Sequence, residues 1–361
     1  MTRNVAPALQ SGELLSSWLV RYALASGCDP LSLTGTLWRG ARPWTRDLDR
    51  GLPETMLVAL AERFDFATDA LRDALLTRHV PRTGIRLERP VWPWILPVGA
   101  RNRLRHGGLQ FCPRCLAEDR IPYYRVRWRL AWVTCCDVHG VTLLDCCAKC
   151  QAPAEPHRLA GIDHSLTICA TCKASLALQH ACEALPEART FQAIAQHVAA
   201  SGHGAFGSLS MEGSEWFAMA RHMSVLLRRA SSAKPDWSLH RLSSDLGLSD
   251  IARFRSSTGL ALELLGTQDR SDLLAGVAQL ISVGVDRFVD AVQTAGVTLR
   301  VLSSGNRNPP AALMTRLAIS HSTDAVRHRT KQRRRTTAPR SPASVRQSWL
   351  RLQRRMAAEL R

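Results

Sequence analysis

The chain has 361 residues with 45% hydrophobic side chains, which is enough to bury a core in two or three domains. Its formal net charge is +18, and only four of the 48 basic residues are Lys. A basic balance dominated by Arg favours a polyanionic partner, most often nucleic acid. No apolar stretch resembles a membrane span, and the N-terminus lacks the apolar core of a signal peptide. We therefore expect a protein of the bacterial cytoplasm.

The first hundred residues predict a small helical domain. Apolar residues recur at helical spacing over 13–27, and further helices are predicted over 31–38, 53–64 and 69–79. Residues 14–38 fit a helix-turn-helix, although many three-helix clusters share this pattern.

A stretch rich in Pro and Trp follows at 90–105 and predicts an extended, packed connector. It leads into the part of the chain that holds most of the cysteines.

Eight Cys and His side chains between residues 112 and 172 form two patterns typical of zinc sites. The first is C-x2-C-x20-C-x2-H and the second is C-x2-C-x18-C-x2-C. A C-x2-C turn directs two thiolates at one tetrahedral ion, and two such turns complete its coordination. We expect two Zn²⁺ ions, one held by Cys112, Cys115, Cys136 and His139, the other by Cys147, Cys150, Cys169 and Cys172.

Other interpretations of these cysteines fit less well. A reducing cytosol favours metal over disulfides, and two separate quartets, one containing His, fit zinc better than an iron–sulfur cluster. The register stays open by one residue, because Cys135 and Cys146 each adjoin a predicted ligand. Cys28 and Cys182 lie far from these patterns and are expected to be core residues. His157 and His164 lie between Cys150 and Cys169 and are expected not to bind metal, because four cysteines already complete that site.

Inside the first metal loop, apolar and basic residues alternate over 124–132. Period two predicts a half-buried strand with an arginine face, although Trp128 and Trp132 are also spaced as on a helix. This face would consist of Arg125, Arg127 and Arg129. It fits a surface that contacts phosphate groups or an acidic partner, and it fits equally well the solvent-exposed side of an amphipathic element.

The C-terminal half is predicted to be helical again over 185–230 and 260–302. Between these segments, residues 239–259 carry a second helix-turn-helix pattern. Gly247 lies in its turn, and Ser249 caps a second helix that contains Arg253 and Arg255.

The last 36 residues, 326–361, carry +11 of the net charge and predict a basic, flexible tail. The expected fold is mainly α with small zinc-bound β elements. Its predicted parts are a helical, helix-turn-helix-like domain over 1–105, a tandem zinc-finger region over 106–182, a C-terminal helical domain over 183–325 and the tail.

Motifs of the common enzyme classes are missing. The chain has no G-x4-G-K-[ST] loop, no H-E-x-x-H and no H-x-E of the zinc deaminases. Both predicted metal sites are saturated by protein ligands, which leaves no position for a catalytic water. We therefore expect a protein that is not an enzyme.

Three segments together resemble the TniQ/TnsD family of transposon target-selection proteins. They are ELLSSWLVRYA at 13–23, FCPRCLAEDRIPYYRVRWRLAW at 111–132 and CDVHGVTLLDCCAKC at 136–150. The resemblance covers residues 13–172. In the family's cysteine pairs a proline usually follows the first Cys, whereas Asp137 and Ala148 stand there in this chain.

The resemblance implies a non-catalytic adaptor. Members of the family couple target recognition to an AAA+ ATPase of the TnsC/TniB type, which admits a DDE transposase. Some read a DNA site directly, some act as a dimer bound to a CRISPR Cascade effector, and others work in mercury-resistance-type transposons with a resolvase. The alternative function is a zinc-containing, sequence-specific DNA-binding transcriptional regulator, and a third is a zinc hydrolase or nuclease.

The arginines named above, together with a cluster in the tail, are the expected phosphate contacts. Such contacts make affinity fall steeply with salt concentration. The predicted nucleic-acid-binding residues are Arg125, Arg127, Arg129, Arg253, Arg255, Arg333, Arg334 and Arg335.

Overall fold

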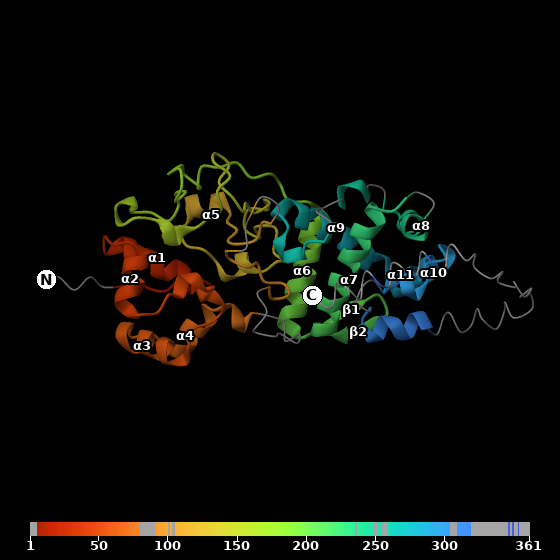
Figure 1. Cartoon of the computed structure of the whole chain (residues 1–361), viewed down its shortest axis with the longest axis horizontal. Helices are drawn as coiled ribbons and strands as arrows, with labels where there is room; N and C mark the ends of the chain where they lie inside the picture. Colours follow the sequence, from red (N-terminus) through yellow and green to blue (C-terminus); the bar gives the residue numbers. More distant parts are fainter. Residues whose placement is uncertain are drawn as a thin grey trace, which may run out of the picture. The chain divides into compact units, whose positions relative to one another are not determined.

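The computed structural model describes residues 6–79, 91–99, 102, 105–234, 237–248, 251–254, 259–303, 309–318, 346, 349 and 353. The chain groups into two compact units, Met1–Arg316 and Leu317–Arg361. All the helices and strands named below belong to the first unit (Figure 1). The predicted tail over 326–361 lies almost wholly outside the described residues, and the four predicted domain boundaries stay predictions.

Short helices surround an aromatic core in the first part of the chain. Trp18 is fully buried, and its ring centroid lies 5.2 to 5.6 Å from those of Tyr22, Phe64 and Phe66. Rings at this separation attract one another beyond the burial of their area. The predicted helices are confirmed here, the last of them in two pieces. The elements are α1 (Leu15–Ala25), α2 (Pro30–Leu37), η1 (Pro43–Thr45), η2 (Leu48–Arg50), α3 (Glu54–Phe64), α4 (Thr68–Asp73) and η3 (Leu76–Arg78).

The connector is packed, as predicted, over its described residues 91–99. Trp94 is only 1% exposed. The backbone N–H of Leu96 donates to the carbonyl of Arg129, and the N–H of Ala131 donates to the carbonyl of Trp94, at 2.9 and 2.8 Å. The connector is therefore hydrogen-bonded to the segment that follows the first ligand pair.

Residues 124–132 do not form the predicted strand. The segment contains a 3-10 turn, η4 (Val126–Arg129), between single β-bridges. The turn brings the buried rings of Tyr124 and Trp128 to 6.1 Å. Apolar residues that alternate in the sequence therefore pack on one side of a turn. The alternative spacing of four residues, as on a helix, predicted this arrangement better than the spacing of two.

The rest of the metal-binding region is held by short turns. Its regular elements are α5 (Pro113–Glu118), η5 (Pro156–Arg158) and η6 (Gly161–Asp163). Its predicted small β elements are isolated β-bridges, such as Phe111 with Leu144. The positions of the predicted ligands are thus fixed by turns and bridges.

The C-terminal half is helical, as predicted, with one addition. A two-stranded antiparallel hairpin interrupts the predicted helical segment, with Phe206 opposite Leu209 across a two-residue turn. The elements are α6 (Pro186–Ser201), β1 (His203–Phe206), β2 (Leu209–Glu212), α7 (Gly213–Ser231), α8 (Ser238–Asp245), η7 (Ile251–Phe254), η8 (Leu262–Leu264), α9 (Thr267–Val283), α10 (Val285–Thr294) and α11 (Leu299–Leu302).

Helix α9 packs against both α6 and α7. A Cβ on Gly276 of α9 would lie 2.6 Å from the ring of Phe254, so a glycine is required for η7 to pack this closely. Among the described residues, no helix is both long and apolar enough to cross a membrane.

The second helix-turn-helix pattern is only partly described. Helix α8 occupies its first half, and Gly247 has a φ of 73° in the turn. Of its predicted second helix, the structure describes the 3-10 turn η7, while residues 249–250 and 255–258 lie outside the described part. Both helix-turn-helix assignments remain predictions.

Buried polar contacts join the metal-binding region to the C-terminal helices. Glu263 is fully buried, forms an ion pair with Arg221 and accepts a hydrogen bond of 2.6 Å from the N–H of Trp94. Gln110 is also buried and accepts a hydrogen bond of 2.7 Å from Arg270 of α9. These pairs fix the register of one part on the other, because a buried charge that loses its partner is costly.

Candidate metal centres and nucleic-acid-binding residues

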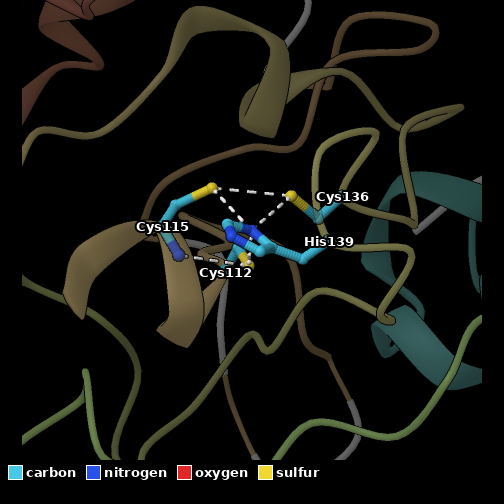
Figure 2. Close-up of side chains that lie close together, drawn as sticks. All are labelled: Cys112, Cys115, Cys136 and His139. Atoms are coloured by element: carbon cyan, nitrogen blue, oxygen red, sulfur yellow. Dashed lines mark hydrogen bonds between the residues drawn. The ribbon is translucent and has the colours of Figure 1, made fainter. Parts of the chain in front are cut away.

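The first predicted ligand set comes together in the structure. Cys112 caps the N-terminus of α5, Cys115 lies on its first turn, and Cys136 and His139 lie on one tight turn further along. Their four ligand atoms all lie within 4.8 Å of one another. Figure 2 shows the three thiols and the imidazole converging on one point.

The spacing of these atoms fits zinc. The Sγ atoms of Cys115 and Cys136 are 3.5 Å apart, and the Nδ1 atom of His139 lies 3.3 to 3.5 Å from the three sulfurs. A tetrahedron with Zn–S bonds of about 2.3 Å has edges of about 3.8 Å. The donor set and its size therefore match a closed tetrahedral site.

Glu118 orients the histidine ligand. The Nε2 atom of His139 lies 2.9 Å from a carboxylate oxygen of Glu118, which comes from the end of α5. A carboxylate that accepts the Nε2 proton leaves Nδ1 free to bind the ion, and such partners raise the basicity of the ligand. The sequence patterns did not identify Glu118, although it lies three residues after Cys115 on the same helix.

The second set also comes together, around four sulfurs. Cys147 lies 3.7 Å from Cys172, and Cys150 lies 3.6 Å from Cys169, measured between Sγ atoms. All four sulfurs lie within 4.8 Å of one another. The side chain of Gln179 donates to the Cys147 sulfur at 3.3 Å and accepts from the N–H of Ala148 at 3.0 Å.

Three of the four ligand pairs each lie on a backbone turn of the same type. The residue after the second ligand has a positive φ: 65° at Gly140, 59° at Gln151 and 59° at Lys173. Its N–H donates to the carbonyl of the pair's first ligand at 2.8 to 2.9 Å. Left-handed backbone is unfavourable for Gln and Lys, so the turn imposes it there.

The open question of register is resolved. Cys136 and Cys147 belong to the two clusters, whereas Cys135 and Cys146 do not. Of the other two cysteines, Cys28 is half-buried and Cys182 is exposed, so the prediction that both are core residues is wrong for Cys182. The residues around Cys182 have no apolar periodicity, so the sequence holds no pattern from which the exposure of this side chain could be predicted.

His157 and His164, which lie between the two ligand pairs of the second cluster, belong to neither cluster, as expected. The imidazole of His157 stacks on Trp44 with ring centroids 5.2 Å apart. Burial lowers the pKa of His157 to about 4, and the charge of Arg158 adds to this effect. His157 is therefore neutral at pH 7 and serves as a packing residue.

One thiol in each cluster, that of Cys136 or Cys147, has a pKa below its usual value. Hydrogen bonds from Cys112 and Cys115 lower the pKa of Cys136 and leave the pKa of Cys115 raised. Burial opposes ionisation of Cys147, but the backbone N–H groups of Cys150 and Lys149 lower its pKa to about 7. Thiolates are the species that bind metal, so both clusters are suited to bind an ion near neutral pH.

The segment at 13–23 is tied to the metal-binding region by buried polar contacts. Glu13 is fully buried and accepts hydrogen bonds of 2.8 Å from both Ser17 Oγ and Arg21 Nε. The same Ser17 hydroxyl accepts a hydrogen bond of 2.9 Å from the N–H of Tyr124. These residues therefore join α1 to the loop between the two ligand pairs of the first metal site.

Residues 4–143 match the family model described as TniQ. The chain carries a TniQ domain over these residues. The match confirms the resemblance seen at 13–23 and 111–132, and it links the protein to target selection in transposition. It contains the whole first metal cluster and ends before the second. No curated protein matches the chain.

Inside the TniQ domain, the three arginines of η4 and its flank do not form one face. Arg125 forms an ion pair of 2.9 Å with Asp119, and its guanidinium lies over the ring of Tyr123 at 4.5 Å. Arg127 forms an ion pair with Asp137, which lies inside the turn between Cys136 and His139. Both cations are thus engaged within the domain.

Arg129 is fully buried, so its prediction as a surface phosphate contact is not supported by its position. Its guanidinium pairs with Asp47 and, at 3.1 Å, with Asp49. It also donates to the carbonyl of Leu96 at 2.7 Å. Burial raises the pKa of Asp49 to about 6, although Arg129 opposes that shift. Arg129 therefore joins η2, the connector and the metal-binding region from the inside.

The remaining predicted DNA contacts lie in or beyond η7. Arg253 is half-buried, with its guanidinium 5.3 Å from the ring of Phe254, and its Nε and Nη2 atoms have no hydrogen-bond partner among the described residues. The others lie outside the described residues: Arg255, Arg333, Arg334 and Arg335.

Proposed function

We propose that the protein is a non-catalytic adaptor of DNA transposition. It couples recognition of a target to an AAA+ regulator of the TnsC/TniB type and, through that regulator, to a DDE transposase complex. The observation that carries the proposal is the TniQ domain at residues 4–143. Target recognition proceeds either by direct DNA binding or through a CRISPR Cascade effector, with the protein acting as a homodimer in the latter case.

The two metal clusters support a scaffolding role. Each offers four protein ligands with tetrahedral spacing, so an ion bound there has its coordination completed by protein and takes no substrate. When bound, each zinc supplies folding free energy on the order of 10 kcal/mol. Turns with little apolar core of their own would then be rigid enough to present a binding surface.

The adaptor role is tested by capture of the ATPase. Full-length protein with an affinity tag is mixed with an AAA+ ATPase of the TnsC/TniB type, with ATP and target DNA present. An adaptor retains the ATPase and is required for insertion in a reconstituted transposition reaction. A protein that binds DNA with sequence preference but retains no ATPase is instead the alternative, a zinc-containing transcriptional regulator.

The possibility of an enzyme is tested with the same material. Turnover of DNA by the purified protein that depends on added metal would support a zinc nuclease and contradict the adaptor. We expect no turnover, because neither cluster leaves a ligand position open for water.

A further inference from the structure

The loop between α2 and η2 presents three arginines that form no ion pair. Arg39, Arg42 and Arg46 are all exposed, and their guanidinium groups form no ion pair or hydrogen bond within the described part of the chain. We propose that these residues, the 39–46 arginine patch, form a binding surface for the phosphate backbone of duplex DNA. The inference rests on the proposed function and deepens it, because it names a surface for the direct DNA route.

Two backbone turns carry these three side chains. Arg39 and Gly40 form the centre of a turn, closed by the N–H of Ala41 donating to the carbonyl of Trp38 at 3.1 Å. Gly40 has a φ of 77° there, which glycine adopts without strain. Arg42 and Arg46 flank the 3-10 turn η1, at whose rise of about 2 Å per residue they lie about 8 Å apart.

Apolar residues of the same loop hold it against the rest of the domain. Trp38 and Pro43 are buried. Trp44 is held from two sides: its Nε1 donates to Thr34 Oγ1 at 2.8 Å, and its ring stacks on His157. The arginines therefore stand on a braced loop, and less conformational freedom is lost when they bind.

The acidic residues of this stretch are turned inward. The side chains of Asp47 and Asp49 are 8% and 4% exposed, and both pair with the buried Arg129. Asp47 and Asp49 are the only acidic residues between positions 38 and 50, so no exposed carboxylate of this stretch neutralises the three arginines.

The chemistry of the patch favours a nucleic-acid backbone. The chain makes seven residue steps from Arg39 to Arg46, so the patch spans at most about 23 Å and covers no more than about seven base-pair steps at about 3.4 Å each. No large hydrophobic side chain is exposed between residues 38 and 50, so the patch lacks the apolar anchor that a lipid surface needs. Guanidinium groups bind phosphate oxygens in pairs of hydrogen bonds.

The test compares two triple variants of the full-length protein. In one, Arg39, Arg42 and Arg46 are changed to Gln. In the control, the same change is made at Arg63, Arg120 and Arg300, which are also exposed and form no ion pair. Binding to a 30-base-pair duplex of arbitrary sequence is measured by fluorescence anisotropy over a series of salt concentrations, with zinc content and thermal midpoint as checks of folding.

The patch variant is expected to bind about tenfold or more weakly near 100 mM salt, with the slope of log K against log[salt] lower in magnitude by about 2 to 3. The control is expected to bind like the wild type. Equal losses in both variants would show a general charge effect and overturn the patch. Unchanged DNA binding by the patch variant, with lost binding to polyglutamate, would overturn it in favour of an acidic protein.

Failure of the proposed function would look different. A wild type that binds no duplex at 50 mM salt would overturn the patch while leaving ATPase capture intact. Absence of ATPase capture would overturn the adaptor role. The salt slopes of DNA binding by the two variants would still decide whether the 39–46 arginine patch binds DNA.

Discussion

His139 has two ring nitrogens with two different partners, and this division defines its role as a ligand. Nδ1 faces the three sulfurs, and Nε2 faces Glu118. The arrangement resembles the contact between a carboxylate and a metal-bound histidine that strengthens many zinc sites. The metal affinity of the first centre should therefore depend on a residue that never touches the ion.

Changing Glu118 to Gln should lower the zinc affinity of the first centre by about 10- to 100-fold and leave the second centre unchanged. Competition with a chromophoric chelator measures the two sites as two phases of release. The control is Glu62→Gln, an exposed acid with no partner among the described residues. Two phases identical to those of the wild type would show that Glu118 has no part in the site.

His222 is a buried base without a partner. It lies on α7, is 8% exposed, and its Nε2 atom has no hydrogen bond among the described residues. Burial, assisted by the charge of Arg229, lowers its pKa to about 4. Because the unfolded chain has a pKa of about 6.5, it binds the proton more tightly than the folded chain does. The stability that this histidine contributes is complete above pH 6.5 and is lost as the pH falls towards 4.

Replacing His222 by Leu should remove this part of the pH dependence. The loss in unfolding free energy between pH 7 and pH 4.5 should be smaller in the variant than in the wild type, by about 2 kcal/mol. Zinc ligands also protonate in this range, so only the difference between the two proteins is informative. His197→Leu, at an exposed position of α6, should behave like the wild type. If H222L has the same pH dependence of unfolding free energy as the wild type, His222 is not the source of this part of the pH dependence.

The side chains that the sequence did not predict correctly are those whose partners lie far away in it. Arg129 alternates with apolar residues as an exposed cation would, yet it is buried because Asp47 and Asp49, 82 and 80 residues earlier, pair with it. Local patterning has no access to such a pair. The eight metal ligands were predictable for the opposite reason, since each half-site is contained in four residues.

At the scale of elements, the second metal loop packs directly on the corner between α1 and α2. A Cβ on Gly161 of η6 would lie 2.5 Å from the carbonyl oxygen of Gly27. The Gly161 N–H also donates to the Asp29 carboxylate at 2.6 Å. Only glycine allows this approach of two backbones. The four-cysteine centre therefore supports the first helices of the chain as well as its own loop.

Changing Gly161 to Ala should separate these two elements. We expect a loss of about 2 kcal/mol or more in unfolding free energy, together with faster amide exchange in α1 and α2, because the added methyl has only backbone to displace. Gly35→Ala on α2 is the matched control, since nothing lies within 4 Å of its Cβ position. Equal stability of G161A and G35A would contradict the packing described.

Helices with strong apolar periodicity were predicted with bounds correct to within a few residues, and α3, predicted over 53–64, is an example. The hairpin of β1 and β2 was missed although its turn, Gly207-Ser208, is a known hairpin signal. Its strands have only four residues each, too few for a period of two to stand out between two helices. Residue 204 of β1 is a glycine for a tertiary reason, because a Cβ there would lie 2.5 Å from the Trp216 ring.

For the whole molecule, charge is distributed unevenly along the chain. Residues 326–361 carry +11 of the total of +18. Deleting 327–361 should weaken binding to duplex DNA and reduce the magnitude of its salt slope, because fewer phosphates are neutralised. Zinc content should stay the same, since both clusters lie before residue 173. Unchanged affinity and slope would show that the tail makes no DNA contact.

Two closed zinc centres are proposed to hold the middle of the chain together as a scaffold. Elemental analysis of the purified full-length protein tests it most directly, with Cys112→Ser and Cys169→Ser as variants and Cys28→Ser as the control outside both clusters. We expect two zinc ions per chain in the wild type and in C28S, and one in each ligand variant, with a lower unfolding temperature. Far fewer than two zinc ions in the wild type, or ligand variants that fold and support transposition unchanged, would contradict it.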